Sequence, residues 1–203
     1  MTLNLPAHGA TLWDTPVNAA FNTLASTGFA PNEHGWLNWT YCPSLAQNTD
    51  GLISGTVRMI KLPNLPLAYT ITSIKYFVGV AATTPTAGQC FAGIYDSSGN
   101  RLAVTADISA SLSTTGLKTF TLTAPLAVSV NQPIWGAILV NAAVAPSGAT
   151  AVVQAGREPL INGDLTIAQS LYTSGPAAQT SLPASIAMGA RTQIPRSPWL
   201  AVA

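Results

Sequence analysis

The sequence predicts an all-β protein, an antiparallel, jelly-roll-like β-sandwich. In residues 71–80, Ile74, Tyr76, Val78 and Val80 recur at a period of two, as a half-buried strand requires. A hairpin signal follows at residues 90–105, and further strand-like runs continue to about residue 155 without a helical period between them. Short strands at this spacing are typical of a sandwich.

The hairpin consists of residues 90–95 and 101–105 around the turn Asp96-Ser-Ser-Gly-Asn. The Asp96 side chain can bond the backbone two residues on, and Gly99 can supply a positive φ. The turn offers too few oxygens for calcium, which takes about six to eight ligands, so a plain Asx-type turn is favoured. Arg101 is expected to be a solvated charge that protects a sheet edge.

The remaining strands are expected at residues 53–62, 117–122, 127–130, 134–141 and 149–155. Two prolines in residues 61–67 indicate an extended connector along an edge. The predicted core contains Ile74, Tyr76, Val78, Ile94, Leu102, Phe120, Leu122, Ile138 and Val140.

Residues 1–30 read as an extended arm and a short helix for attachment or oligomerisation. Pro16 suits a first helical turn, and Val17, Ala20, Phe21 and Leu24 recur at helical spacing before Gly28. A helix this short is marginal in water unless its apolar face docks on something. The candidate attachment residues in this part are Trp13, Val17, Phe21 and Leu24.

Residues 31–155 are assigned to the sandwich, and residues 156–203 to an irregular extension that packs on the sandwich or on neighbours. The extension is rich in Gly, Pro, Ser and Thr. It is too apolar for ordinary disorder, which needs low hydrophobicity and high charge. Trp199, a further attachment candidate, and Leu200 are expected to hold the C-terminus in a neighbour's groove.

Charged residues make up 7% of the chain and apolar residues 48%. So few charges favour a surface covered by other subunits, and we expect a homo-oligomer. The net charge of +1 argues against electrostatic capture of nucleic acid or anionic lipid. No run reaches the roughly 18 apolar residues of a membrane span, and the N-terminus does not resemble a signal peptide. Cys42 and Cys90 are expected to be buried free thiols.

The titratable residues suggest no enzyme. The seven acids form no recognisable glycosidase pair, and His8 and His34 lie beside no nucleophile signature. Phosphate-binding glycine loops and HExxH motifs are absent from the sequence. We therefore expect no catalytic residue, no cofactor and no metal site.

The aromatic residues Trp36, Trp39 and Trp135 are candidates for either glycan stacking or an interface. Aromatic clusters more often fill a core or an interface, because each ring buries a large area. Exposure of the rings distinguishes the two: a flat exposed pair favours a glycan reader, and full burial favours assembly.

Residues 5–19, LPAHGATLWDTPVNA, resemble the opening of minor tail and fibre-type proteins of tailed bacteriophages that infect actinobacteria. Residues 93–103 and 113–125 are similar to the β-sandwich module of the same virion proteins. The resemblance implies a structural protein on the virion surface, assembled in the host cytoplasm. Its implied partners are identical subunits, with a trimer favoured, other virion proteins and a host-envelope glycan. Two alternatives remain open: a capsid decoration or head-fibre protein, and a carbohydrate-binding module.

Overall fold

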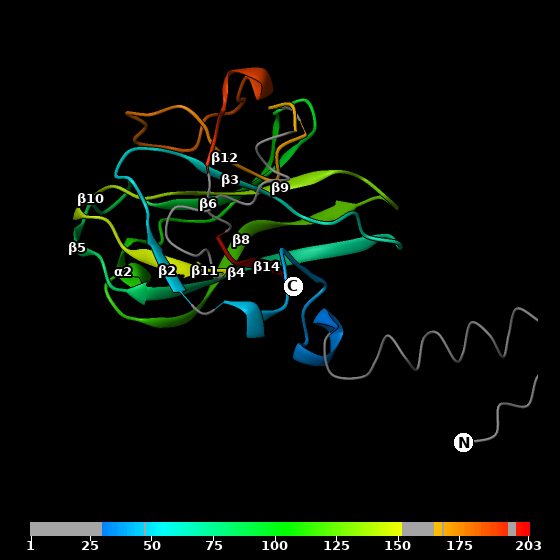
Figure 1. Ribbon diagram of the computed structural model, residues 1–203, viewed down its shortest axis with the longest axis horizontal. Coiled ribbons are helices and arrows are strands. Elements are labelled where there is room, and N and C mark those ends of the chain that lie inside the picture. Colours follow the sequence, from blue (N-terminus) through cyan, green and yellow to red (C-terminus); the bar gives the residue numbers. More distant parts are fainter. Residues whose placement is uncertain (1–29, 47, 152–164, 168, 195–197) are drawn as a thin grey trace, which may run out of the picture.

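The computed structural model describes residues 30–46, 48–151, 165–167, 169–194 and 198–203. Two antiparallel sheets lie one above the other and enclose the main core (Figure 1). The predicted all-β sandwich is confirmed. The predicted N-terminal helix, with Trp13, Val17, Phe21 and Leu24, lies outside the described residues.

Sheet A is organised around its longest central strand, β4 (Tyr69–Val80). Along one edge, β4 pairs with β8 (Gly116–Val128). Along the other edge it pairs with two shorter strands, β14 (Leu200–Val202) and β11 (Ser147–Thr150). These two strands pair in turn with β1 (Asn38–Trp39) and β2 (Asn48–Gly51), respectively.

Sheet B has the strand order β13-β12-β3-β9-β6-β7, with every pair antiparallel. The bounds are β13 (Thr192–Gln193), β12 (Tyr172–Ser174), β3 (Arg58–Lys61), β9 (Ile134–Leu139), β6 (Phe91–Asp96) and β7 (Arg101–Val104). A small ladder of β5 (Thr83–Pro85) and β10 (Ala142–Val144) lies outside both sheets. The described helices are α2 (Ser109–Leu112) and the 3₁₀ turns η1 (Pro31–His34), η2 (Pro43–Leu45) and η3 (Met188–Ala190).

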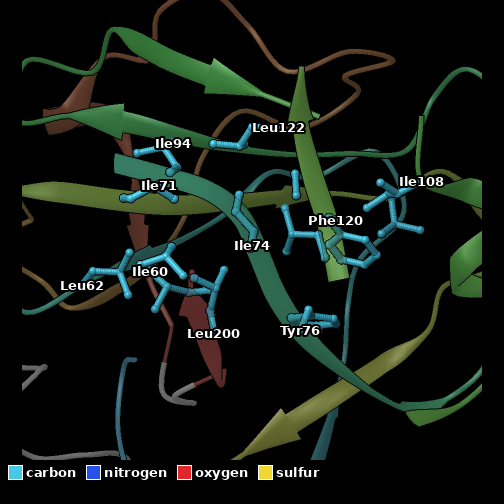
Figure 2. Packing of buried hydrophobic residues seen from close by; sticks show 14 of the residues in the cluster. Ile60, Leu62, Ile71, Ile74, Tyr76, Ile94, Ile108, Phe120, Leu122 and Leu200 are labelled. Carbon is cyan, nitrogen blue, oxygen red and sulfur yellow. The ribbon is translucent and has the colours of Figure 1, made fainter. Parts of the chain in front are cut away.

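The core lies between the two sheets and is drawn in Figure 2. Alternation on β4 points Ile74, Tyr76 and Val78 inward, and β14 adds Leu200 and Val202. All predicted core residues are buried except Leu102, which is partly exposed and packs against the core from outside. The edge position of β7 explains the difference, because every residue of that strand is partly exposed.

A second apolar layer covers the outer face of sheet B. Every residue of β9 is buried, so its outward side chains Trp135, Ala137 and Leu139 are also covered. Leu182 and Ile186 pack on them, from the orange and red segment above sheet B in Figure 1. The C-terminal extension thus packs on its own sandwich.

Arg191 anchors this cover beneath the surface. Its guanidinium donates hydrogen bonds to the carbonyls of Met188 (2.8 Å) and Ile167 (2.9 Å) and to Thr173 Oγ1 (3.1 Å). Three fixed acceptors suit the planar guanidinium. Burial lowers the pKa of Arg191. These three hydrogen bonds therefore replace the water that would otherwise stabilise the positive charge of Arg191.

The expected irregular extension also contributes strands. β12 and β13 extend sheet B, and β14 lies inside sheet A between β1 and β4. Trp199 and Leu200, expected in a neighbour's groove, are instead buried within their own chain. The correction has a physical reason: the backbone of Leu200–Val202 finds its hydrogen-bond partners on β4 and β1 of the same molecule.

The predicted hairpin and its Asx-type turn are confirmed. Asp96 Oδ1 accepts hydrogen bonds from the backbone N–H of Ser98 (2.9 Å) and Asn100 (2.8 Å), and Gly99 has φ +87°. Arg101 is not the solvated edge charge that was expected. Its backbone N–H bonds the carbonyl of Ala184 (2.9 Å) and its guanidinium bonds that of Leu182, so the C-terminal segment covers this edge.

Several strand predictions differ from the structure in their bounds. The run expected at residues 134–141 ends at Leu139 as β9, and the run expected at 149–155 corresponds to β11, which ends at Thr150; residues 152–155 lie outside the described residues. The strand expected at residues 53–62 begins only at Arg58, because a turn with Gly55 at φ +75° precedes it. The runs at 117–122 and 127–130 belong to one strand, β8, whose pairing with β4 is interrupted between Ile71 and Ser73. At the interruption, Thr123 Oγ1 donates to the carbonyl of Val104 (2.9 Å), which joins β8 to sheet B.

Candidate interaction groove

A hollow of about 670 Å³ lies on the outer face of sheet A. We call it the sheet A groove. It is lined by Trp36, Pro43, Ala46, Asn48, Thr49, Phe77, Leu117, Ala149 and Trp199. None of these residues carries a charge. The groove is therefore suited to an apolar, uncharged partner.

Strands β4 and β8 supply an exposed apolar pair to the groove. Phe77 and Leu117 lie directly opposite each other in the ladder. They remain 39% and 51% exposed, although both are large and apolar. Gly79 helps to shape the adjoining region, since a Cβ there would lie 2.2 Å from Thr49 Cγ2. Only glycine lets the side chain of Thr49 lie so close to β4.

The opposite side of the groove is an aromatic wall formed by Trp36 and Trp199. The ring of Trp36 stacks on His34 at 5.1 Å and meets Trp199 edge-on at 5.2 Å. Trp199 is held in place, because its Nε1 donates a hydrogen bond to the carbonyl of Tyr41 (3.1 Å). Trp39 also touches Trp36, at 5.9 Å. The chain positions this wall by pairing β1 with β14, which brings residues about 160 positions apart into contact.

The three candidate tryptophans do not form one surface. Trp36 and Trp39 lie together, but their planes are inclined by 73° and Trp39 is 7% exposed. Trp135 is on the outer face of sheet B and is 3% exposed, with Lys61 Nζ 5.4 Å and Arg191 Cζ 5.8 Å from its ring. By the exposure criterion stated above, this arrangement favours assembly over a flat glycan platform.

Two aspartates of the described part have pKa values set by local structure. Burial raises the pKa of Asp107, but hydrogen bonds from Ser109 and from the backbone N–H groups of Gly88 and Cys90 outweigh it and lower the pKa. The pKa of Asp96 is lowered in the same way by Asn100, Ser98 and Gly99, against the opposing effect of burial. Both carboxylates thus hold turns through several backbone bonds.

The cysteines are free, and Cys90 is buried as expected. Burial raises the pKa of the Cys90 thiol, which contacts the carbonyl of Asn141 at 3.4 Å. Cys42 was also expected to be buried, but it is partly exposed, with its Sγ 3.0 Å from Ser44 Oγ. Its position next to η2, on the surface beside the groove, explains the difference.

Within the described ranges, no group of three or more His, Cys, Asp or Glu side chains is placed to hold a metal ion. In the same part of the chain, no helix has the length and apolar character needed to cross a bilayer.

Sequence reasoning found two groove residues, Trp36 and Trp199, and missed Phe77 and Leu117. A signal for them exists in the strand pattern. On β4, Lys75 and Phe77 share the outward face, and a large ring on an otherwise polar face marks a surface with a partner.

Fold and groove together define an all-β sandwich with an aromatic, uncharged interaction surface on one outer face. Comparison with protein-family models and with curated proteins finds no match to this chain.

Proposed function

We propose that this protein is a structural component of a tailed-bacteriophage virion, of the minor tail, tail-tip or fibre type. It is displayed on the particle surface as a homo-oligomer, most simply a trimer, and reaches the host envelope there. Its work is assembly and display, without catalysis.

The observation that carries this proposal is the sheet A groove. Phe77 and Leu117 leave two large apolar side chains in contact with water, and no lining residue carries a charge. Exposed apolar surface of this kind is characteristic of contacts between proteins. The low overall charge and the resemblance of residues 5–19 to phage tail proteins support the same function.

The orientation of the tryptophans supports assembly over glycan reading as the main role. Sugar stacking needs a ring face that is open to solvent, and Trp39, Trp135 and Trp199 are each less than 10% exposed. Trp36 alone of the groove tryptophans is partly exposed, and His34 stacks on it.

The proposal is tested by locating the protein in purified particles. Mass spectrometry of particles should find it at a fixed copy number, a multiple of three for trimers. Imaging with an antibody label should place it on the tail. Label on the capsid would support the decoration alternative and refute the tail assignment. Absence from particles would refute the virion function altogether.

A search for hydrolytic activity provides an independent check of the non-enzymatic proposal. Replacement of Glu33 and His34 together by Ala should change particle incorporation by no more than a small factor, because both side chains are exposed in η1 and neither lines the sheet A groove, although His34 stacks on Trp36. Loss of a hydrolytic activity in this variant would overturn the non-enzymatic proposal.

A further inference from the structure

We propose that the sheet A groove of one subunit receives the apolar face of residues 15–25 of a neighbouring copy. This inference rests on the proposed homo-oligomer and names the contact that holds it together.

The groove and residues 15–25 are chemically complementary. Residues 15–32 contain no charged side chain, and Val17, Phe21 and Leu24 fall on one face at helical spacing. The groove offers Phe77, Leu117 and the aromatic wall, and it is likewise uncharged. An aromatic and two aliphatic side chains at such spacing are the usual anchors of a helix that lies in an apolar groove.

The described chain begins at Ala30, six residues before the groove residue Trp36. Ala30 has an extended backbone and leads into η1, and the N–H of Trp36 bonds the carbonyl of Pro31 (3.0 Å). The N-terminal segment therefore leaves the sandwich next to the wall of the groove. Residues 25–29 span at most about 17 Å, so this length limits how far residue 25 can lie from Ala30 and keeps it within reach of a neighbour packed against this face.

Among the described residues, the groove is a place where the apolar cover of a sheet face stays incomplete. The outer face of sheet B is covered by Leu182 and Ile186 of the same chain. On sheet A, the cover from residues 36–46 ends at the groove, where Phe77 and Leu117 stay exposed. Exchange of a terminal segment between identical subunits is a low-cost way to bury such a surface and build a closed assembly.

The experiment uses the full-length protein and two pairs of matched variants. Phe21→Asp with Leu24→Asp places two charges on the apolar face of the segment. Asn18→Asp with Asn22→Asp places the same charge on its polar face and serves as the control. On the groove, Leu117→Asp is compared with Val130→Asp, because the two native side chains are 51% and 53% exposed and Val130 does not line the groove.

Two readouts are recorded on each protein: hydrogen exchange of residues 15–25, followed by mass spectrometry, and sedimentation over a range of concentrations. We expect the wild type to sediment as an oligomer with slowed exchange in this segment, and dilution to monomer to remove the protection. Both test variants should accelerate exchange by at least about tenfold and shift sedimentation to monomer. Both controls should behave as the wild type. Unchanged near-ultraviolet circular dichroism shows that Leu117→Asp still folds.

The proposal is overturned by protection that survives in Leu117→Asp. Protection that persists in the diluted monomer overturns it too, because the segment then lies on its own chain. An oligomer that is indifferent to both test variants refutes the groove contact and leaves the proposed oligomer standing. A protein that meets every expectation in solution yet is missing from purified particles refutes only the virion function.

Discussion

Leu200 and Gly136 form a contact between the two sheets that can be measured by a double-mutant cycle. Leu200 is fully buried. A Cβ added at Gly136, on the facing strand β9, would lie 2.8 and 2.9 Å from the two Cδ atoms of Leu200. Glycine at 136 therefore makes the room that Leu200 fills.

The two single substitutions disturb this contact in opposite ways: one leaves the space empty, and the other overfills it. Leu200→Ala removes three buried carbons and leaves a cavity, and it should lower the free energy of unfolding by about 3 kcal/mol. Gly136→Ala pushes a methyl group into the Leu200 side chain and should lower it by about 1–3 kcal/mol. In the double variant the new methyl group enters the space that Leu200 has left. The combined loss should be smaller than the sum by at least about 1 kcal/mol.

The assay is equilibrium unfolding in urea, with fixed protomer concentration because an oligomer's stability depends on it. Val144, which is 59% exposed on β10, provides the control. Val144→Ala should add to Leu200→Ala within about 0.5 kcal/mol. If Gly136→Ala destabilises the Leu200→Ala protein as much as it destabilises the wild type, the proposed packing between β9 and β14 is refuted.

Three further predictions concern single sites. Gly99→Ala should lower the free energy of unfolding by more than about 1 kcal/mol, because φ is +87° and a Cβ would lie 1.9 Å from the carbonyl oxygen of Ile186. Gly88→Ala, at φ +74° with open space around it, should cause a smaller loss of free energy in the same denaturation assay. Tyr76→Phe should be neutral or stabilising, since the buried hydroxyl has no hydrogen-bond partner in the described part of the chain; a loss above about 1 kcal/mol would show that a partner exists. Ionised Asp96 adds stability above its ordinary pKa of 3.8, and this contribution is lost as the pH falls from about 5 through the lowered pKa of the folded state. Asp96→Asn should therefore make the melting temperature depend less on pH on the acid side. An unchanged dependence would contradict this.

Local sequence patterns were sufficient to predict the long strands and the hairpin. β4 carries apolar side chains at a period of two, β9 is a continuous apolar run, and Asp96 with Gly99 specifies the turn between β6 and β7. These signals act over a few residues, so they can be read without knowing what the strands pack against.

The short C-terminal strands could not be predicted in this way. β12, β13 and β14 contain only three, two and three residues, which is too few for a period to show. Their stability comes from ladders with strands far away in sequence: β14, for example, is specified by β4 and β1.

The groove was predicted only in part, for the same reason. The sequence marked Trp36 and Trp199 as aromatic candidates, but the contact between them depends on the pairing of β1 with β14. Phe77 and Leu117 face each other across a ladder whose register is interrupted near Ile71, and local patterns do not fix that register.

The position of β14 inside sheet A has a consequence for synthesis. β4 and β1 leave the ribosome well before their shared neighbour, and β1 and residues 74–76 of β4 remain unpaired along the shared edge until residues 200–202 have been made. Folding through such distant pairings is slow, and unpaired edges are sites of aggregation. Chains that stop before β14 would also lack Trp199, so they would expose the unfinished groove together with two strand edges. We therefore expect chains that lack β14 to aggregate, so that only chains that include it are available for assembly.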